Sequence, residues 1–344
     1  MRVAVVALET VHRRETEGTR RVQRVAEDLA ADGHEVTVFC TRWWPESPLV
    51  VESGAVTYNA VTDEPSAPVF AFRLPFLLAQ EPFDAVHVHP VPPAVLHAAC
   101  VGAAFVRAPL VADWYGDEAY PDTLRGRTAL RGGSLMTAPS ELVCSWVREA
   151  GATVETTVVP EPIDFDLVSE TEPAGDAEVM IATDLDEDAN LTSALLALAD
   201  LSDVPTTTVV GDGPERDRYE SQAHDLKLQD SVTFVGDRPR EERVARYRAA
   251  DVFVHTATWA PFATELLWGL ACGCVGVVQY QAESAAHELV AGYGRGLLAT
   301  DDEDVVDALR EARTFPHWSI DESFADYDRG AVLDRYLSLY RDLD

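Results

Sequence analysis

Runs of apolar residues alternate with helical patterns from the start of the chain. Val3 to Leu8 is a continuous apolar stretch, which predicts a buried strand, and a polar loop then leads to Gly18. A helical pattern follows, with apolar residues at positions i, i+3, i+4 and i+7: Val22, Val25, Ala26 and Leu29. Gly33 stands where a helix commonly ends, and Val36 to Cys40 is the next apolar run. The pattern predicts a strand–helix–strand unit with parallel strands.

The same rhythm continues through both halves of the chain. In the first half, further strands are predicted at 85–88, 109–112 and 134–138. In the second half, strands are predicted at 178–182, 206–210, 232–235, 252–255 and 275–278, with helices at 191–201, 241–248 and 264–272 and one after Pro214. Strands that alternate with helices are typical of α/β folds with a doubly wound parallel sheet.

Two prolines interrupt this rhythm near the middle. Pro160 and Pro162 remove backbone donors and favour extended conformations in their neighbours, so we place a hinge there. The sequence thus predicts two Rossmann-like domains, residues 1–160 and 167–320, facing a cleft. Apolar and aromatic residues at helical spacing predict a last helix, 322–344, that returns to the first domain.

Charge separates this chain from most globular proteins. Its 344 residues include 59 acidic and 27 basic ones, for a formal net charge of −32, and Lys227 is the only lysine. Such a surface repels nucleic-acid phosphates and anionic lipid, which disfavours nucleic-acid binding and leaves at most peripheral membrane contact. Acidic surfaces stay hydrated in concentrated salt, where screening removes their self-repulsion, so the composition indicates a halophilic protein.

The cysteines and the apolar runs bear on redox state and location. Five widely spaced cysteines in apolar segments indicate reduced, buried thiols rather than disulfides. Cys272 and Cys274 have no second Cys/His pair at matching spacing, so buried small residues are favoured over a metal site. No signal peptide and no stretch of membrane-spanning length is found, so we expect a cytoplasmic protein.

Three sequence blocks carry a family resemblance. They are Val209 to Glu215 with Gly211-Asp212-Gly213, Val232 to Gly236, and Ala250 to Val254. In this order and spacing the chain resembles family 4 glycosyltransferases of the GT-B fold, in a haloarchaeal type. The resemblance implies that a sugar is transferred with retention from a nucleotide-diphosphate donor, held by the C-terminal domain, to a saccharide or lipid-linked acceptor held mainly by the N-terminal one. It implies neither a cofactor nor a required divalent metal.

The resemblance also implies a donor site, with departures. Family members place one glutamate before Pro-Phe-Gly and another eight positions on, where this chain has Ala260 and Trp268; Glu265 is the remaining carboxylate there and the candidate catalytic substitute. Its alternative role is that of a first-turn glutamate beside Thr264 as N-cap. The candidate donor-binding residues are Gly18, Gly211, Gly213, Arg216, Arg238, Pro261, Phe262, Thr264, Glu283, Ser284 and Glu288.

Several of these candidate residues also suit purely structural roles. The glycines at 211 and 213 also suit a tight turn before a helix, and Arg216 and Arg238 also suit solvated surface positions. The family's cations after the first strand of this domain are replaced by the acidic segment Asp184 to Asp188, which would repel a diphosphate.

On the acceptor side, the candidate catalytic residues are His89 and Asp113. His87 and His89 lie two residues apart near a strand end; one of them is a candidate to reach the cleft as a base or hydrogen-bond donor, and each also suits a satisfied strand-end position. Asp113 opens the segment Asp113 to Glu118, whose acids suit sugar hydroxyls. The apolar stretch Phe70 to Leu78 suits core packing or a lipid-linked acceptor.

Two function classes remain open. The leading one is glycosyl transfer, and the other is a non-catalytic sugar-nucleotide-binding or scaffolding partner. A dehydrogenase is disfavoured, because no strand is followed by the dinucleotide-binding glycine pattern.

Overall fold

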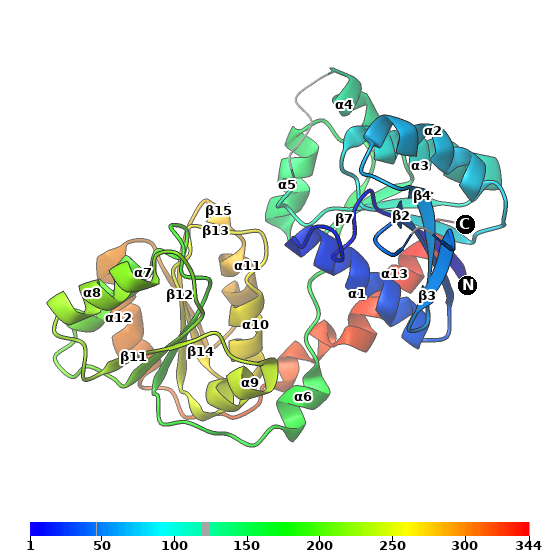
Figure 1. Cartoon of the computed structure of the whole chain (residues 1–344). Coiled ribbons are helices and arrows are strands. Elements are labelled where there is room, and N and C mark those ends of the chain that lie inside the picture. Colours follow the sequence, from blue (N-terminus) through cyan, green and yellow to red (C-terminus); the bar gives the residue numbers. More distant parts are fainter. Residues whose placement is uncertain (46, 119–123, 344) are drawn as a thin grey trace. The chain divides into compact units, whose positions relative to one another are not determined.

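The chain divides into two compact units. A computed structural model describes every residue except 46, 119–123 and 344. Unit 1 comprises Met1–Glu161 and Gly330–Asp344, and unit 2 comprises Pro162–Arg329 (Figure 1). Unit 1 is thus built from both ends of the sequence, whereas unit 2 is one continuous segment.

Unit 1 contains an eight-stranded sheet in the order β3-β4-β2-β1-β5-β6-β7-β8. All neighbouring strands are parallel except β3 and β4, which form an antiparallel edge pair. The strands are β1 Arg2–Val6, β2 Glu35–Thr41, β3 Val50–Ser53, β4 Val56–Thr62, β5 Ala85–Val88, β6 Leu110–Asp113, β7 Leu135–Ala138 and β8 Thr156–Val158. The helices are α1 Glu17–Ala31, α2 Ala67–Leu78, α3 Pro93–Val106, α4 Leu124–Ala129, α5 Glu141–Glu149 and α13 Arg329–Asp342.

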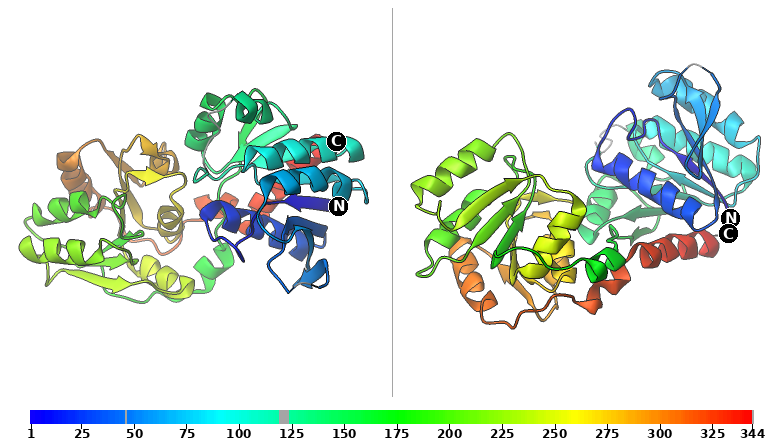
Figure 2. Two further views of the ribbon diagram at one scale, coloured as in Figure 1. Left: turned by 45° about the horizontal axis from the view of Figure 1, so that its top comes forward. Right: turned by 60° about the horizontal axis from the view of Figure 1, so that its bottom comes forward.

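Helices cover both faces of this sheet, because alternate strand residues point to opposite sides. In β1, Ala4 and Val6 pack in a core with α2, α3 and α5, whereas Val3 and Val5 pack in a second core with α1 and α13. The C-terminal helix α13 therefore completes the core beneath the first strand of the chain (Figure 2).

Unit 2 has a parallel six-stranded sheet in the order β11-β10-β9-β12-β14-β16 and a small pair of strands, β13 and β15. The strands are β9 Val179–Ala182, β10 Thr207–Val210, β11 Val232–Gly236, β12 Val252–His255, β13 Trp259–Ala260, β14 Val275–Gln279, β15 Glu283–Ser284 and β16 Gly296–Ala299. The helices are α6 Phe165–Glu170, α7 Leu191–Ala199, α8 Arg216–Asp225, α9 Arg240–Ala249, α10 Thr264–Ala271, α11 Ala286–Val290, α12 Asp302–Ala312 and the 3-10 helix η1 Glu322–Tyr327. Here α7, α8 and α12 share one core, while α9, α10 and α11 share the other.

The doubly wound α/β class predicted from the sequence is confirmed, but two local predictions are wrong. The segment 322–344 is not one helix: η1 packs against α10 in unit 2, and α13 begins only at Arg329. The extended backbone of Asp328 interrupts it, and the Asp321 side chain caps η1 by accepting from the backbone N–H of Ser323. The break between η1 and α13 coincides with the end of unit 2 at Arg329. The N-cap of α10 is Ala263, not Thr264, which is the first residue of that helix.

Candidate active site

A pocket of about 390 Å³ lies in unit 1 where strands β1 and β5 end. Ligands of open parallel sheets bind outside the carboxyl ends of the strands, so this is the edge where a site is expected. The lining combines apolar and polar side chains: Leu8, Glu9, Arg14, Thr16, Thr19, His89, Val91, Pro92, Pro93, Asp117 and Glu118. Acids, one arginine and a histidine within one hollow suit a polyhydroxylated ligand.

The first turn of α1 forms one wall of this pocket. The Thr16 side chain accepts a hydrogen bond from the Thr19 backbone N–H, and the Thr19 hydroxyl accepts one in return from the Thr16 backbone N–H, so the helix start is fixed. Gly18 lies between them, and its backbone N–H donates to Asp117 Oδ2 at 3.2 Å. A Cβ at position 18 would lie 2.9 Å from both Asp117 Oδ1 and His89 Cε1. Gly18 is therefore needed for close approach of α1 to the strand-end side chains.

His89 follows β5 and lines the pocket, whereas His87 lies within the strand and contacts Tyr340 of α13 through Nδ1 at 2.8 Å. His89 is 6% exposed, and among the described residues its Nδ1 has no hydrogen-bond partner; Glu118 Oε1 is 3.7 Å away. Burial lowers the pKa of His89 to about 4, because the charged imidazolium is poorly solvated there. The imidazole is thus neutral near pH 7, and its buried Nδ1 lacks a hydrogen-bond partner among the described residues.

Glu118 ends the acidic segment 113–118 that the sequence suggested for sugar hydroxyls, and it lines the pocket beside His89. Its carboxylate accepts hydrogen bonds from the backbone N–H groups of Tyr115 and Gly116, at 2.8 and 2.7 Å. Burial raises the pKa of Glu118 to about 7, more than these two bonds lower it. The sequence signal was the acidic run at the end of β6, which points to this edge without saying which acid faces the pocket.

Asp113, predicted to be catalytic, lies in the interior of unit 1. It is 1% exposed, and the Arg21 guanidinium donates to both of its oxygens, at 2.8 and 3.0 Å. The hydroxyls of Thr137 and Tyr336 donate to it at 2.6 and 3.0 Å, and His87 Nε2 is 3.3 Å away. Burial alone would raise the pKa of Asp113, but Arg21 outweighs it and holds the pKa well below its ordinary value. This burial does not fit contact with a substrate; Asp113 instead joins β6 to α1, β7 and α13.

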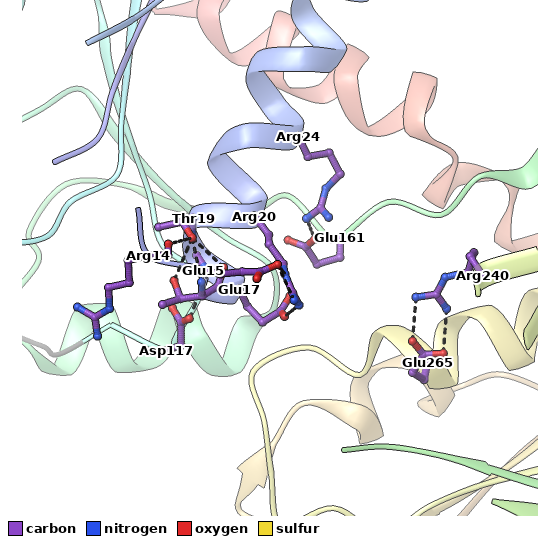
Figure 3. Close-up of polar contacts among 12 residues, drawn as sticks. Arg14, Glu15, Glu17, Thr19, Arg20, Arg24, Asp117, Glu161, Arg240 and Glu265 are labelled. Atoms are coloured by element: carbon purple, nitrogen blue, oxygen red, sulfur yellow. Dashed lines mark hydrogen bonds and ion pairs between the residues drawn. The ribbon is translucent and has the colours of Figure 1, made fainter. Parts of the chain in front are cut away.

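Glu161 completes this interior network at the end of the first segment of unit 1. Its carboxylate forms ion pairs with Arg21 and Arg24, and Figure 3 shows the pairing with Arg24. Arg21 and Glu161 are nearly fully buried. The residues just before the chain leaves unit 1 are therefore held by charge to α1.

Glu265 lies in the first turn of α10, and both of its oxygens are engaged. Arg240 donates to Oε2 and Oε1, each at 2.9 Å, as Figure 3 shows. Arg243 donates to Oε1 at 3.0 Å, and the Tyr247 hydroxyl donates to Oε2 at 2.7 Å. Burial would raise the pKa of Glu265, but the two arginines lower it below its ordinary value. The carboxylate thus ties α10 to α9, which favours its alternative role in the helix over a catalytic one.

Ala260 and Trp268 occupy the two positions where the resemblance implies glutamates. The Trp268 ring packs against the Arg240 guanidinium, with the guanidinium carbon 4.9 Å from the ring centroid. Ala260 pairs with Ser284 between β13 and β15. Both positions serve the packing of unit 2.

Gly211 and Gly213 allow two loops of unit 2 to touch. Gly211 has φ +130°, and a Cβ there would lie 1.9 Å from the Thr183 carbonyl oxygen. A Cβ at Gly213 would lie 2.3 Å from the Leu185 carbonyl oxygen, and the Leu185 N–H donates to the Asp212 carbonyl at 2.9 Å. The close approach that these glycines permit is to the acidic segment after β9.

The two candidate arginines of unit 2 make contacts with neighbouring groups. Arg216 donates to Glu220 at 2.8 Å and lies 3.6 Å from Asp212. Arg238 donates to the Asp237 carbonyl at 3.2 Å and lies 3.8 Å from Glu242. Their guanidinium groups face carboxylates, as solvated surface arginines commonly do.

The remaining candidate donor residues gather around β13 and β15. The Ala285 N–H donates to the Ala260 carbonyl at 2.8 Å, which draws the segment with Glu283 and Ser284 beside Pro261. Phe262 and Ser284 are buried, Glu283 is exposed, and Glu288 lies in the first turn of α11. The structure thus brings Pro261, Glu283 and Ser284 together on one side of unit 2.

The described residues were also compared with the arrangements typical of metal sites and membrane-spanning helices. Within residues 1–45, 47–118 and 124–343, no group of three or more His, Cys, Asp or Glu side chains is arranged to hold a metal ion. The five cysteines are free thiols, and burial raises the pKa of Cys272 to about 12. Among the helices that the structure describes, none has the length and apolarity needed to cross a bilayer.

Two doubly wound units in one chain define the GT-B fold, and solved structures confirm it. Sucrose-phosphate synthase from Thermosynechococcus elongatus aligns with a TM-score of 0.71 at 18% identity, covering 99% of this chain and 98% of that one. A glycosyltransferase from Rickettsia africae gives 0.77 at 14% identity, with coverage of 99% and 98%. Anabaena HepE, solved in complex with UDP, gives 0.74 at 16% identity, with coverage of 99% and 100%.

Two glycosyltransferase family models together match residues 18–324 of the chain. Residues 18–167 match Glycosyltransferase Family 4, and residues 163–324 match Glycosyl transferases group 1. Alpha-monoglucosyldiacylglycerol synthase from Streptococcus pneumoniae is 26% identical over 192 residues, which is 51% of this chain and 43% of that protein. The match thus spans less than half the length of this relative.

Proposed function

We propose that the protein transfers a sugar, with retention, from a nucleotide-diphosphate sugar to an acceptor. Unit 2 binds the donor, and unit 1 binds the acceptor, either a saccharide or a lipid-linked one. Anabaena HepE, which shares the fold, binds UDP, and this supports a nucleotide-diphosphate donor. No cofactor and no divalent metal is assigned a step.

The observation that carries the proposal is the pocket of unit 1 with its neutral, unpartnered imidazole. A buried polar group without a partner is costly, and a ligand hydroxyl that hydrogen-bonds to it removes that cost. We assign His89 to an acceptor hydroxyl, with Glu118 and Asp117 accepting from neighbouring hydroxyls and Arg14 offering a cation. Gly18 keeps these side chains at their places.

For the donor we propose the region around β13 and β15. Pro261, Phe262, Thr264, Glu283, Ser284 and Glu288 lie on these strands or on the helices that follow them. The first turn of α10 offers backbone N–H groups to phosphate oxygens, and Arg216, Arg238, Gly211 and Gly213 are the further candidates. Donor binding there would depend on backbone groups more than on a dedicated cation.

A binding and turnover experiment tests this proposal. Calorimetry of the full chain with a panel of nucleotide-diphosphate sugars in molar KCl should give heat with at least one donor. Release of the nucleoside diphosphate should then depend on an added acceptor, and proton NMR of the product should show the anomeric configuration of the donor. Absence of heat with every donor would exclude the proposal, and an inverted product would exclude retention.

A second function is favoured by the contacts of Glu265. Its carboxylate is saturated by Arg240, Arg243 and Tyr247, and neither Ala260 nor Trp268 supplies an acid. Catalysis needs interactions that are stronger in the transition state than in the ground state, and the family's two glutamates are absent. Heat with a donor, but no product with any acceptor, would identify a non-catalytic sugar-nucleotide-binding protein.

We further propose that the protein works in concentrated salt. The net charge of −32 destabilises the folded chain through self-repulsion, which salt screens. The thermal unfolding midpoint should rise steeply from low to molar KCl. A flat midpoint would contradict halophilic adaptation.

A further inference from the structure

Helices α2 and α3 present a large apolar surface to solvent. Phe72 is 72% exposed, and Phe76 and Phe105 are each 61% exposed; Val69 and Val101 are also exposed. These five residues form the apolar face, the name used below for this surface. Three exposed phenylalanines on two neighbouring helices exceed the scattered single residues usual on a soluble surface.

The fold places these side chains on one surface. The two helices pack side by side, as Figures 1 and 2 show, and a Cβ at Gly102 of α3 would lie 2.5 Å from Leu78 of α2. In α2, Phe70, Leu74 and Leu78 point into the core. The spacing of Val69, Phe72 and Phe76 puts them on the opposite side of the helix, where the rings of Phe72 and Phe76 lie 5.8 Å apart.

The charge around this face is opposite to that of the whole chain. Neither the 12 residues of α2 nor the 14 residues of α3 include an acid, although the chain has 59. The exposed polar residues at its border are basic: Arg73 on α2, His97 on α3 and Arg107 at the end of α3.

The acids that flank α2 are paired with arginines. Asp63 is paired with Arg42 at 2.5 Å, Glu64 with Arg13 at 2.7 Å and Glu81 with Arg2 at 2.9 Å. Asp63 and Glu64 thus each have an arginine partner, whereas Arg2 is shared between Glu81 and Glu35.

We propose that the apolar face of α2 and α3 docks onto a phospholipid bilayer. The phenylalanines enter the headgroup boundary, and Arg73 and Arg107 contact lipid phosphates. Both helices connect parallel strands and run in the same direction, and Pro93 at the start of α3 lines the pocket of His89. The apolar face thus begins with Val69 near the edge of the sheet where the proposed acceptor binds and extends to Phe76 and Phe105 in the last turns of the two helices, and docking itself does not depend on transfer.

Salt should strengthen this docking. At low ionic strength the net charge of −32 repels an anionic bilayer over a long range, but in about 1 M salt the screening length falls to about 3 Å. Burial of the phenylalanines acts at contact and is not screened. Binding to anionic vesicles should therefore rise with KCl, the reverse of a binder held by charge alone.

Vesicle flotation of the full chain tests the proposal, with phosphatidylglycerol and phosphatidylcholine in equal parts. In molar KCl the wild type should float with the vesicles. The triple variant F72S/F76S/F105S should bind at least tenfold more weakly. The matched control L196S/L298S removes exposed apolar residues from unit 2 and should bind like the wild type. Circular dichroism and calorimetry should show folded proteins with unchanged donor binding.

The charge-reversed variant R73E/R107E supplies a second test that keeps the phenylalanines. It should bind vesicles several-fold more weakly than the wild type. Failure of the wild type to float at any KCl concentration, or equal flotation of the triple variant, would overturn the proposal. Self-association without vesicles that F72S/F76S/F105S abolishes would also overturn it, because the face would then be an interface between copies of this chain.

Discussion

The carboxyl edges of the two sheets differ in how their polar groups are used. In unit 1 the edge is hollow, and the His89 imidazole lacks a hydrogen-bond partner among the described residues. In unit 2 the glycines at 211 and 213 pack on the carbonyls of Thr183 and Leu185, and Glu265 is saturated by α9. Unit 1 therefore keeps polar groups available for a ligand, whereas unit 2 uses the groups at its family positions to hold its own elements together.

This difference shows that a family motif and a ligand-binding group are separable. A glycine lets another group come close to its backbone, and that group can belong to the protein itself as well as to a ligand. A carboxylate contributes to catalysis only where its oxygens are free to meet the substrate.

The largest expected effect comes from filling the space above Gly18. Gly18→Val introduces a branched side chain where a Cβ alone would lie 2.9 Å from His89 and Asp117, so the pocket must rearrange. We expect loss of transfer by roughly a thousandfold, about 4 kcal/mol in transition-state stabilisation. The measurement is the rate of nucleoside diphosphate release.

The matched control is Gly294→Ala, at an exposed glycine of unit 2 with nothing within 4 Å of its added Cβ. It should leave transfer unchanged. Full activity of Gly18→Val would break the comparison, because the pocket would not then be the functional edge.

Removing the unpartnered imidazole should have the next largest effect. His89→Phe keeps the ring but loses its hydrogen bonds, and we expect transfer to fall about a hundredfold. His89→Gln should retain more activity, since the amide still hydrogen-bonds. The pKa of about 4 keeps the wild-type imidazole neutral, so the activity of the wild type should show no titration of this group between pH 5 and 8.

The control for this prediction is His224→Phe, at a largely exposed histidine of α8. Equal loss in both variants would indicate a general effect of the substitution rather than a role for the pocket.

Neutralising Glu265 should affect stability rather than turnover. Glu265→Gln leaves Arg240 and Arg243 without their shared carboxylate, and we expect unfolding to become easier by about 2 kcal/mol because the pair is only partly exposed. Chemical denaturation in molar KCl measures this, with Glu241→Gln on the exposed side of α9 as control. If a folded Glu265→Gln protein loses turnover completely, Glu265 is catalytic and the two edges are alike.

The smallest effect concerns pH and the pair His89 and Glu118. The lowered pKa of His89 means that the unfolded chain takes up a proton first as pH falls below about 6.5, so stability is lost toward pH 4. The raised pKa of Glu118 acts oppositely: its protonated form is favoured in the folded state, so stability is lost as pH rises from about 4.5 through 7.

Glu118→Gln removes the second effect and leaves the first. Relative to the wild type, its free energy of unfolding should rise by at least about 1 kcal/mol between pH 4.5 and 8. Parallel curves for the two proteins would show that the Glu118 carboxyl titrates normally.

Much of the fold was predictable because strand and helix signals are local. The apolar run at 252–255 and the helical spacing at 22–29 depend on neighbours a few residues away, and the structure confirms β12 and α1 there. The end of the chain was harder, because the break at Asp328 depends on a bridge to Ile163, far away in sequence.

The candidate site shows the same limit. His89 comes directly after the predicted strand 85–88, and the structure places it in the pocket. Asp113 has the same local signals, but its partners Arg21 and Tyr336 come from the two ends of the chain, and no spacing in the sequence reveals them. Thr264 has a side chain typical of N-cap residues. In the structure, however, Ala263 is the N-cap and Thr264 is the first residue of the helix.

The network around Asp113 also makes the folding of unit 1 depend on helix α13. Tyr336 and Tyr340 of α13 contact Asp113 and His87, so one side of the core of unit 1 is missing until α13 has left the ribosome. Unit 2 is one uninterrupted segment and is fully synthesised earlier, at Arg329. Domains generally fold as units during synthesis, N-terminal first. In this chain, synthesis of unit 1 begins first, but all the residues of unit 2 are made before those of unit 1 are complete.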